Sequence, residues 1–228
     1  MVLSDLCLPR LAKAWPVVHN IRVFKGVAAP VTNTKKHLLE ARFCAVGGQG
    51  IVLGTEIIAS AAIFHEGLYA LQSPTYGSQV RGGPTKVDLI VDDKEILFPK
   101  AENVNFFMAI AQISFTKFWN HIADDAVVLL DSNLVTTMTE EMKANRTFFR
   151  LPVVEMAKKE FNQVILSNMI CLGITQEITR IVKEENLIKA VREKVPPKHL
   201  EKNLAALQMG IELARKEMAG AESLLAVA

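Results

Sequence analysis

Apolar and polar positions follow a repeating pattern from about residue 38 to residue 218, and this pattern predicts strands and helices in turn. Short apolar runs with the length of buried strands lie at 42–46, 68–71, 105–109, 126–130 and 147–151. Longer segments with apolar residues three and four positions apart predict helices at 51–66, 114–121, 152–159, 167–183, 185–194 and 198–218. Strands that alternate with helices indicate an α/β fold whose sheet is at least partly parallel.

Local signals refine this outline. Residues 85–91 alternate in polarity, 92–94 form a turn and 95–98 continue as a second strand, which predicts an inserted β-hairpin. Ser114 is a plausible N-cap for its helix, and Gly67 is expected to end the helix before it. The last helix carries a stripe that is typical of a packing face, made of Leu200, Leu204, Leu207, Ile211, Ala214 and Met218. The expected fold is a Rossmann-like, mainly parallel sheet flanked by helices, with an inserted β-hairpin and a C-terminal helical cluster.

The first 37 residues differ from the rest of the chain. They lack a clear period, contain Pro9, Pro16 and Pro30, and carry six basic residues against one acidic residue, a net charge of +5. We therefore expect a basic N-terminal extension at 1–37, one α/β domain at 38–220 and a tail at 221–228. A targeting sequence is an alternative interpretation of residues 1–37, because transit peptides are also basic and poor in acidic residues.

Composition excludes several classes of protein. Of 228 residues, 50% are hydrophobic and 22% are charged, which is typical of a globular chain. The longest uncharged apolar stretch, Phe161–Gln176, contains polar residues, among them Asn162, Gln163, Ser167 and Asn168, and is too short to span a membrane. Cys7, Cys44 and Cys171 are too widely separated for a disulfide framework, a zinc site or an iron–sulfur cluster, which favours a cytoplasmic protein. Residues 38–228 carry 20 basic and 23 acidic side chains, so no basic domain for nucleic acid is indicated.

A glycine turn, Gly47-Gly48-Gln49-Gly50, joins the first strand to the first helix. Open α/β sheets bind ligands at the carboxyl ends of their strands, and the N–H groups of a helix N-terminus favour an anion. A GxGxxG frame that begins at Gly48 fails because Leu53 occupies its last glycine position. The turn alone is therefore a weak indication of a dinucleotide, and a tight turn with close helix–strand packing is the alternative.

A second candidate lies in the loop from Tyr76 to Gly83. Arg81 has a planar fork of donors that suits a phosphate or carboxylate, and Gly82-Gly83 would allow a ligand or a second chain to approach the backbone. The alternative is a surface arginine paired with a local carboxylate. The five histidines are scattered, and His65 and His121, at the ends of predicted helices, are interpreted as structural, as are Cys44 and Cys171. No phosphate loop, nucleophile elbow or HExxH motif occurs.

In combination, two motifs strongly resemble the γ subunit of 2-oxoacid:ferredoxin (acceptor) oxidoreductases. The first is Gly47-Gly48-Gln49-Gly50-Ile51-Val52-Leu53, and the second is Tyr76-Gly77-Ser78-Gln79-Val80-Arg81-Gly82-Gly83-Pro84-Thr85. The segment Val87–Leu97 followed by Pro99, and Pro196-Pro197-Lys198-His199 with Asn203, are similar to the branch of 2-oxoglutarate-type enzymes. The resemblance covers about residues 38–218. Members of the family usually begin just before the first strand, which leaves residues 1–37 unexplained.

The resemblance implies a subunit of a larger catalyst. The family decarboxylates a 2-oxoacid oxidatively with coenzyme A to an acyl-CoA and passes electrons to ferredoxin. It implies thiamine diphosphate and iron–sulfur clusters on partner α, β and δ subunits or domains, with no catalytic residue, metal or resident cofactor on this chain. It also implies a possible coenzyme A contact. The residues expected at a ligand or subunit contact are Gly47, Gly48, Gln49, Gly50, Tyr76, Arg81, Gly82 and Gly83. Two alternatives stay open, a stand-alone nucleotide-binding module and a purely structural interaction subunit.

Overall fold

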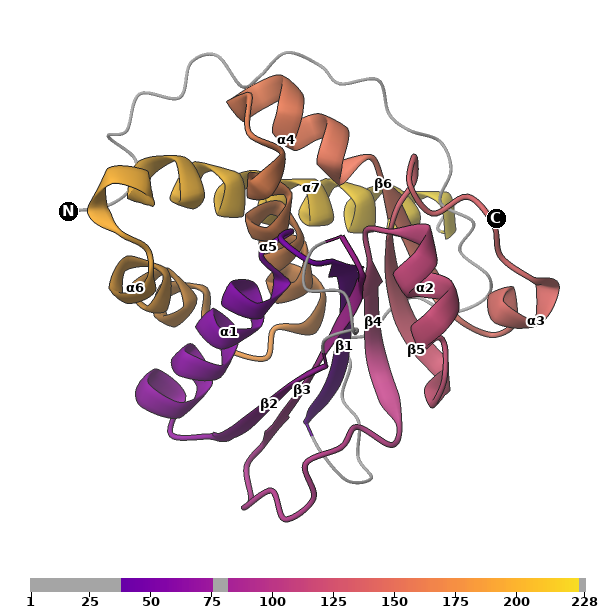
Figure 1. Cartoon of the computed structure of the whole chain (residues 1–228), viewed down its shortest axis with the longest axis horizontal. Helices are drawn as coiled ribbons and strands as arrows, with labels where there is room; N and C mark the ends of the chain where they lie inside the picture. The colour runs from indigo at the N-terminus through magenta and orange to yellow at the C-terminus, as the bar shows by residue number, and fades with distance from the viewer. Residues whose placement is uncertain (1–37, 76–81, 226–228) are drawn as a thin grey trace.

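A six-stranded sheet forms the centre of the structure, a computed structural model that describes residues 38–75 and 82–225 (Figure 1). Its strands are β1 Leu39–Val46, β2 Tyr69–Thr75, β3 Pro84–Asp92, β4 Val104–Ala109, β5 Ile122–Asp131 and β6 Thr147–Leu151. The strand order is β2-β3-β1-β4-β5-β6. The pairs β1–β4, β4–β5 and β5–β6 are parallel, whereas β3 is antiparallel to both β1 and β2. This arrangement confirms the predicted mainly parallel α/β sheet.

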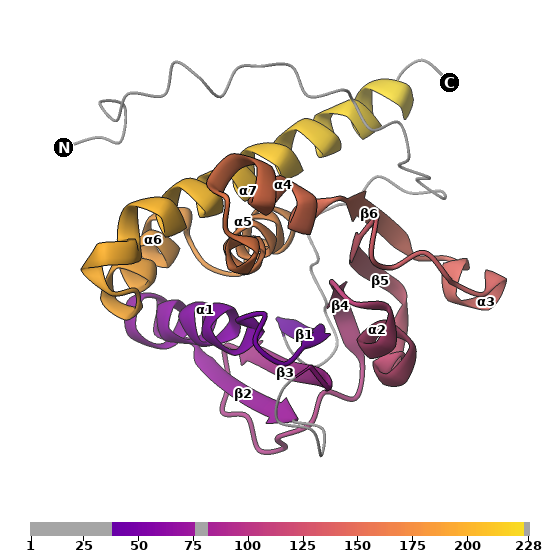
Figure 2. The same cartoon turned by 45° about the horizontal axis from the view of Figure 1, so that its top comes forward.

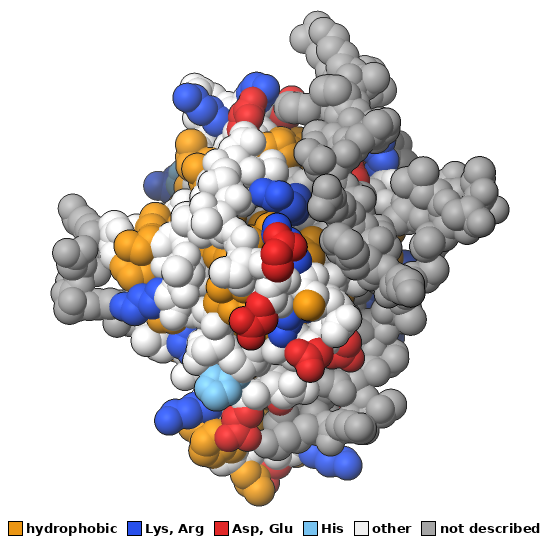
Figure 3. Space-filling view, turned by 90° about the vertical axis from the view of Figure 1, so that its right-hand side faces the viewer, with side chains coloured by type: hydrophobic (Ala, Val, Ile, Leu, Met, Phe, Trp, Pro, Cys, Tyr) orange, Lys and Arg blue, Asp and Glu red, His pale blue; other side chains and the backbone are white. Residues whose placement is uncertain are grey.

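The two faces of the sheet are covered unequally (Figure 2). One face carries five helices, α1 Ile51–Glu66, α4 Val153–Phe161, α5 Ser167–Thr179, α6 Glu184–Lys194 and α7 Pro197–Leu225. Of the described helices, α2 Gln112–Phe118 alone covers the other face, and the short helix α3 Glu140–Lys143 lies to its side. A 3-10 turn, η2 Val164–Leu166, leads into α5. Figure 3 shows the side of the molecule that carries α2 and α3.

Each strand contributes alternate residues to two apolar cores, because successive side chains of a strand point to opposite faces. Ala41 and Phe43 belong to the core under α1 and α5, whereas Cys44 belongs to the core under α2. Arg42, which stands between Ala41 and Phe43 in the sequence, is only 1% exposed. Its Nε and Nη2 donate to the two carboxylate oxygens of Asp88 at 2.6 and 3.1 Å. Its Nη1 donates to two carbonyl oxygens at the end of α2, those of Phe118 and Asn120. A buried arginine is tolerated here because each nitrogen of its guanidinium group has a hydrogen-bond acceptor.

Helices α5 and α7 touch backbone to backbone. A Cβ built on Gly173 would lie 2.1 Å from the carbonyl oxygen of Leu207, and one built on Gly210 would lie 2.1 Å from the carbonyl oxygen of Ile170. Neither position has room for a side chain. The predicted stripe on the last helix faces this contact, since Leu207, Ile211 and Ala214 are buried in the core of its own domain.

The predicted hairpin over residues 85–98 is wrong. The antiparallel hairpin is formed by β2 and β3, which pair from Tyr69↔Asp92 to Thr75↔Lys86. Both edges of β3 are therefore occupied, by β2 on one side and β1 on the other, so Glu95–Phe98 has no free edge to pair with. These residues instead form a loop whose far end is held by Glu40, whose carboxylate accepts from the N–H groups of Glu102 and Asn103.

Several predicted helix ends also differ. Helix α2 begins at Gln112, so Ser114 lies inside its first turn and donates to the carbonyl oxygen of Ala45 instead of capping the helix. His121 lies beyond the end of α2, at φ 58°. Helix α5 ends at Thr179 rather than at residue 183, because Gln176 Nε2 donates to the carbonyl oxygen of Val182 and closes the chain into a turn. Helix α7 continues to Leu225, and the division into three segments stays a prediction.

Candidate functional site

The glycine turn lies where β1 ends and α1 begins, at the carboxyl edge of the parallel strands. Gly50 is the N-cap of α1 at φ 77°, and no side chain caps this helix or places an acidic group in its first turn. Gln49 accepts from the N–H of Val46 through Oε1 at 2.8 Å, and its own N–H donates to the carbonyl oxygen of Val46 at 3.2 Å. Gln49 therefore shapes the turn, and the helix N-terminus keeps the positive end of its dipole available for an anion.

The structure brings the two predicted motifs together. The N–H of Gly47 donates to the carbonyl oxygen of Gly83 at 3.0 Å, so the end of the second loop lies directly beside the glycine turn. Gly83 is buried, whereas Gly82 is exposed at φ 73°. Tyr76 and Arg81 lie outside the described residues. Of the predicted site residues, Gly47–Gly50 and Gly82–Gly83 thus share one edge of the sheet.

Asn168, in the first turn of α5, is a site residue that the sequence analysis missed. Its Nδ2 donates to the carbonyl oxygen of Gly50 at 3.2 Å, and the side chain lies so close that a Cβ on Gly50 would come within 2.3 Å of it. Its Oδ1 and the Oγ of Ser167 are buried without a hydrogen-bond partner among the described residues. The sequence signal that could have found it is a pair of polar residues, Ser167 and Asn168, inside the otherwise apolar run 164–174.

An apolar rim borders the turn. Ile165 in η2 has its Cδ1 3.3 Å from the position of a Cβ on Gly50, and it is 45% exposed beside the 44% exposed Val164. Ile113, at the start of α2, is 56% exposed on the same edge of the sheet. The N-termini of α1 and α5 therefore meet at a surface that combines exposed apolar side chains with unpaired buried polar atoms.

Asp131, at the end of β5, fixes the neighbouring loops. Its Oδ1 accepts from the N–H groups of Asn133 and Leu134 at 2.9 and 3.0 Å, and its Oδ2 accepts from Val154 at 2.9 Å. Burial raises the pKa of Asp131, and the three N–H donors offset this only in part. The carboxylate positions the start of α4 and lies too deep to serve as a surface ligand.

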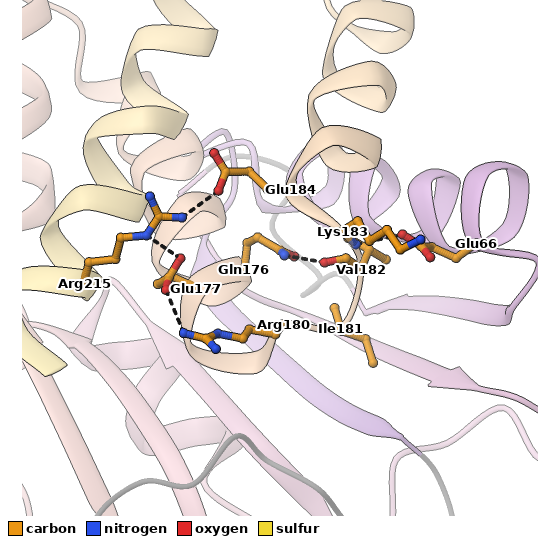
Figure 4. A pocket seen from close by; sticks show the side chains of 9 residues that line it. All are labelled: Glu66, Gln176, Glu177, Arg180, Ile181, Val182, Lys183, Glu184 and Arg215. Atoms are coloured by element: carbon orange, nitrogen blue, oxygen red, sulfur yellow. Dashed lines mark hydrogen bonds and ion pairs between the residues drawn. The ribbon is translucent and has the colours of Figure 1, made fainter. Parts of the chain in front are cut away.

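A surface pocket of about 540 Å³ lies at the C-terminal ends of α1 and α5, far from the glycine turn at the N-terminus of α1 (Figure 4). It is lined by Glu66, Gln176, Glu177, Arg180, Ile181, Val182, Lys183, Glu184 and Arg215. Arg215 pairs with Glu177 at 3.0 Å and with Glu184 at 2.7 Å, and Arg180 pairs with Glu177 at 3.2 Å (Figure 4). These charged side chains pair with one another and hold α5, α6 and α7 together. We therefore interpret the pocket as a structural junction between the helices.

Glu66 contributes to the same junction. Its Oε1 accepts from the N–H of Lys183 and from Asn186 Nδ2, both at 2.7 Å, which ties the end of α1 to the start of α6. Burial alone would raise the pKa of Glu66, but the hydrogen bonds from Lys183 and Asn186 outweigh it and the pKa is lowered. The predicted structural His65 is in the last turn of α1, with Nε2 3.2 Å from a carboxylate oxygen of Glu193.

Within the described ranges 38–75 and 82–225, no three His, Cys, Asp or Glu side chains gather as a metal site. Cys44 and Cys171 are buried free thiols, and burial raises the pKa of both, as expected for inert core residues. None of the helices in this part of the chain is long and apolar enough to cross a membrane.

Known sequences give a consistent set of relatives. Residues 40–213 match the family model of pyruvate ferredoxin/flavodoxin oxidoreductases. The chain is 33% identical over 177 residues to the 2-oxoglutarate synthase subunit KorC of Methanocaldococcus jannaschii, covering 78% of this chain and 94% of that protein. It is 30% identical to the KorC subunit of Methanothermobacter thermautotrophicus, covering 76% and 94%.

Solved structures agree with the sequences. The γ subunit of a keto/oxoacid ferredoxin oxidoreductase from Geobacter sulfurreducens superimposes with a TM-score of 0.69 at 32% identity, covering 78% of this chain and 99% of that one. A 2-oxoglutarate:ferredoxin oxidoreductase from Magnetococcus marinus, solved with 2-oxoglutarate, coenzyme A and succinyl-CoA bound, gives a TM-score of 0.70. At 21% identity, with 78% of this chain and 31% of that chain covered, this second match shows the fold alone.

Proposed function

The chain belongs to the pyruvate ferredoxin/flavodoxin oxidoreductase family, and from this premise we propose a specific task for it. It is a γ-type subunit of a multi-subunit 2-oxoacid:ferredoxin oxidoreductase, an enzyme subunit that is not catalytic alone. The task we propose is contact with coenzyme A at the edge formed by the glycine turn and the second loop. Its relatives named 2-oxoglutarate synthase subunits support 2-oxoglutarate as the 2-oxoacid.

One observation carries this proposal, the hydrogen bond from the N–H of Gly47 to the carbonyl oxygen of Gly83. Gly83 thus lies beside the glycine turn at the uncapped N-terminus of α1, and it follows Arg81 by two positions in the sequence, which supports a role for Arg81 at this edge. A phosphate group of coenzyme A would find helix N–H donors and a guanidinium there, which are two elements of common phosphate sites. The exposed apolar side chains Val164 and Ile165 would contact the less polar part of the ligand or of a partner subunit.

We propose that thiamine diphosphate and the iron–sulfur clusters are held by partner subunits, the α, β and δ chains or domains, and that ferredoxin is reached through the complex. Three separated cysteines, two of them buried in the cores, do not fit cluster ligation. Buried free thiols also support a reducing compartment, and we propose the cytoplasm.

Arg81→Lys in the assembled enzyme tests the site. The substitution keeps the charge but loses the bidentate fork, and a charged hydrogen bond is worth about 1.5–3 kcal/mol, or roughly 10- to 150-fold in binding. We expect the KM for coenzyme A to rise by that factor if Arg81 binds the ligand. If the loop instead contacts a partner subunit, size-exclusion chromatography will show weakened assembly with unchanged kinetics in the remaining complex.

Arg192→Lys, at an exposed position on α6, is the matched control and should change neither property. Unchanged kinetics and unchanged assembly for Arg81→Lys would contradict both roles and leave Arg81 an ordinary surface residue. Purification of the chain from its native source, with mass spectrometry of its companions, tests the γ-subunit role itself.

A further inference from the structure

A cluster of exposed apolar side chains lies at the end of the molecule opposite the glycine turn. Its members are Leu38, Tyr69, Leu97 and Phe98, which are 38%, 50%, 85% and 46% exposed, and we call them the amino-end surface. Leu38 directly precedes β1, Tyr69 begins β2 opposite Asp92, and Leu97 and Phe98 belong to the loop that leaves β3 at the same edge. These four residues therefore gather where β1 begins.

The loop that carries Leu97 and Phe98 is anchored at both ends. Asp92 Oδ1 accepts from the N–H of Lys94 at 3.0 Å, and Glu40 Oε2 accepts from the N–H groups of Glu102 and Asn103 at 2.8 and 2.9 Å. Between these bonds, Ile96 and Ala101 pack into the core under α2. The loop is thus held against the sheet while its two largest apolar side chains face solvent, so the surface is formed in advance.

Acidic side chains border this surface. Over residues 93–102 and 122–125, five exposed side chains are acidic and two are basic, a net charge of −3. Asp93 and Glu95 precede Leu97 in the loop, and Asp124 and Asp125 lie in the irregular start of β5, whose first residue Ile122 pairs with Val104. Asp124 also pairs with Arg146 at 3.3 Å but stays 93% exposed. Toward the lower end of Figure 3, acidic and apolar side chains lie side by side. A ligand for this surface must therefore be apolar and basic.

Residues 1–37 have this chemistry, and they join the described chain at this place. The segment carries six basic residues and one acidic residue, and apolar residues that include Trp15 and Phe24 stand between the charges. It is continuous with Leu38, itself a member of the amino-end surface, so a short tether gives it an effective concentration of about a millimolar there. We propose that the amino-end surface binds the chain's own N-terminal segment, residues 1–37.

Zero-length carbodiimide cross-linking of the full chain tests the proposal, because this reagent joins a lysine only to a carboxylate in contact with it. Lys13 and Lys25 are diagnostic, since Lys35 and Lys36 are too near Leu38 to report on docking. We expect intramolecular links from Lys13 or Lys25 to Asp93, Glu95, Asp124 or Asp125. Links only to other carboxylates, or none, would overturn the proposal.

Two variants separate docking from chance proximity. Leu97→Ser with Phe98→Ser removes apolar side chains that already face solvent, so the fold should be kept while the link yield falls about tenfold. Asp93→Lys with Asp125→Lys reverses two charges of the border, and the links to the untouched Glu95 and Asp124 should fall by a similar factor. Ile113→Ser with Leu134→Ser, at the opposite edge, is the matched control and should leave the yield unchanged. Equal yields in all three would contradict the proposal.

Isotope labelling identifies any other occupant. If labelled and unlabelled chains are mixed and the links join one chain to another, a second copy covers the surface. If the surface carboxylates link to lysines of a partner subunit in the assembled enzyme, that subunit is the occupant. Either result overturns the proposal, and neither affects the γ-subunit role, which co-purification tests separately.

Discussion

Gly50 has a backbone conformation and surroundings that would both disfavour a side chain at this position. Its φ of 77° is in the left-handed region, and a Cβ would lie 2.3 Å from Asn168 Nδ2. Gly50→Ala should therefore lower the free energy of unfolding by about 1–3 kcal/mol and displace Asn168 from the turn. Urea unfolding measures the first effect, and an amide shift of Asn168 in an NMR spectrum measures the second.

Gly54→Ala is the control for this change, because Gly54 lies inside α1 and a Cβ there would meet nothing within 4 Å. Alanine is favoured over glycine within a helix, so this variant should gain about 0.5–1 kcal/mol. A Gly50→Ala protein as stable as the wild type would show that the turn is not held by Asn168.

Single residues also mark the limit of what the sequence could predict. The glycine turn was predictable because Gly47–Gly50 stand between an apolar run and a helical period. Arg42 was not recognised as a buried residue, because its partners Asp88 and Asn120 are 46 and 78 positions away. Asn168 was missed for the same reason, since it meets Gly50 across 118 positions. Local pattern carries no information on such pairings, which only the folded chain brings about.

At the scale of elements, the contact between α5 and α7 is the most restrictive. Gly173 and Gly210 allow the two backbones to meet, and a Cβ at either position would overlap a carbonyl oxygen. Gly173→Ala or Gly210→Ala should therefore separate the helices and lower the free energy of unfolding by about 3 kcal/mol, despite the gain in helix propensity. Denaturant unfolding followed by circular dichroism measures the change.

Gly54→Ala again serves as the helix control, since it adds the same methyl group in open space. Destabilisation of Gly54→Ala by an equal amount would mean that alanine is disfavoured for another reason and that the α5–α7 contact is not the cause. The double variant Gly173→Ala with Gly210→Ala should cost less than the sum of its parts, because one separation relieves both overlaps.

Helices and strands were predicted correctly where the spacing of apolar residues within the segment itself determines its structure. Helix α1 and strand β6 have the predicted bounds, 51–66 and 147–151. The predicted hairpin over 85–98 was wrong because strand pairing depends on which strand edges are free, and β3 already pairs on both sides. The predicted end of α5 was wrong because the side chain of Gln176 closes the following turn, and the spacing of apolar residues does not predict that contact.

At the scale of the whole molecule, the described residues 39–218 supply the side chains of two apolar cores. Removal of residues 1–37 should shift the melting temperature by less than about 4 °C, because a segment that binds at a surface contributes little to the free energy of unfolding. Differential scanning calorimetry of the shortened and full chains makes the comparison. A larger fall, or insoluble expression, would show that the segment is part of the fold.

The unequal covering of the sheet has a consequence during synthesis. All six strands are complete at Leu151, whereas helices α4, α5, α6 and α7, which cover one face, come from residues 153–225. A ribosome needs roughly ten seconds to add these residues. During that time α1 is the one helix, among those that the structure describes, that shields the apolar side chains of that face. A nascent chain that has just finished β6 is therefore the form most in need of a chaperone, and the release of this protein in a folded state waits for its last helix.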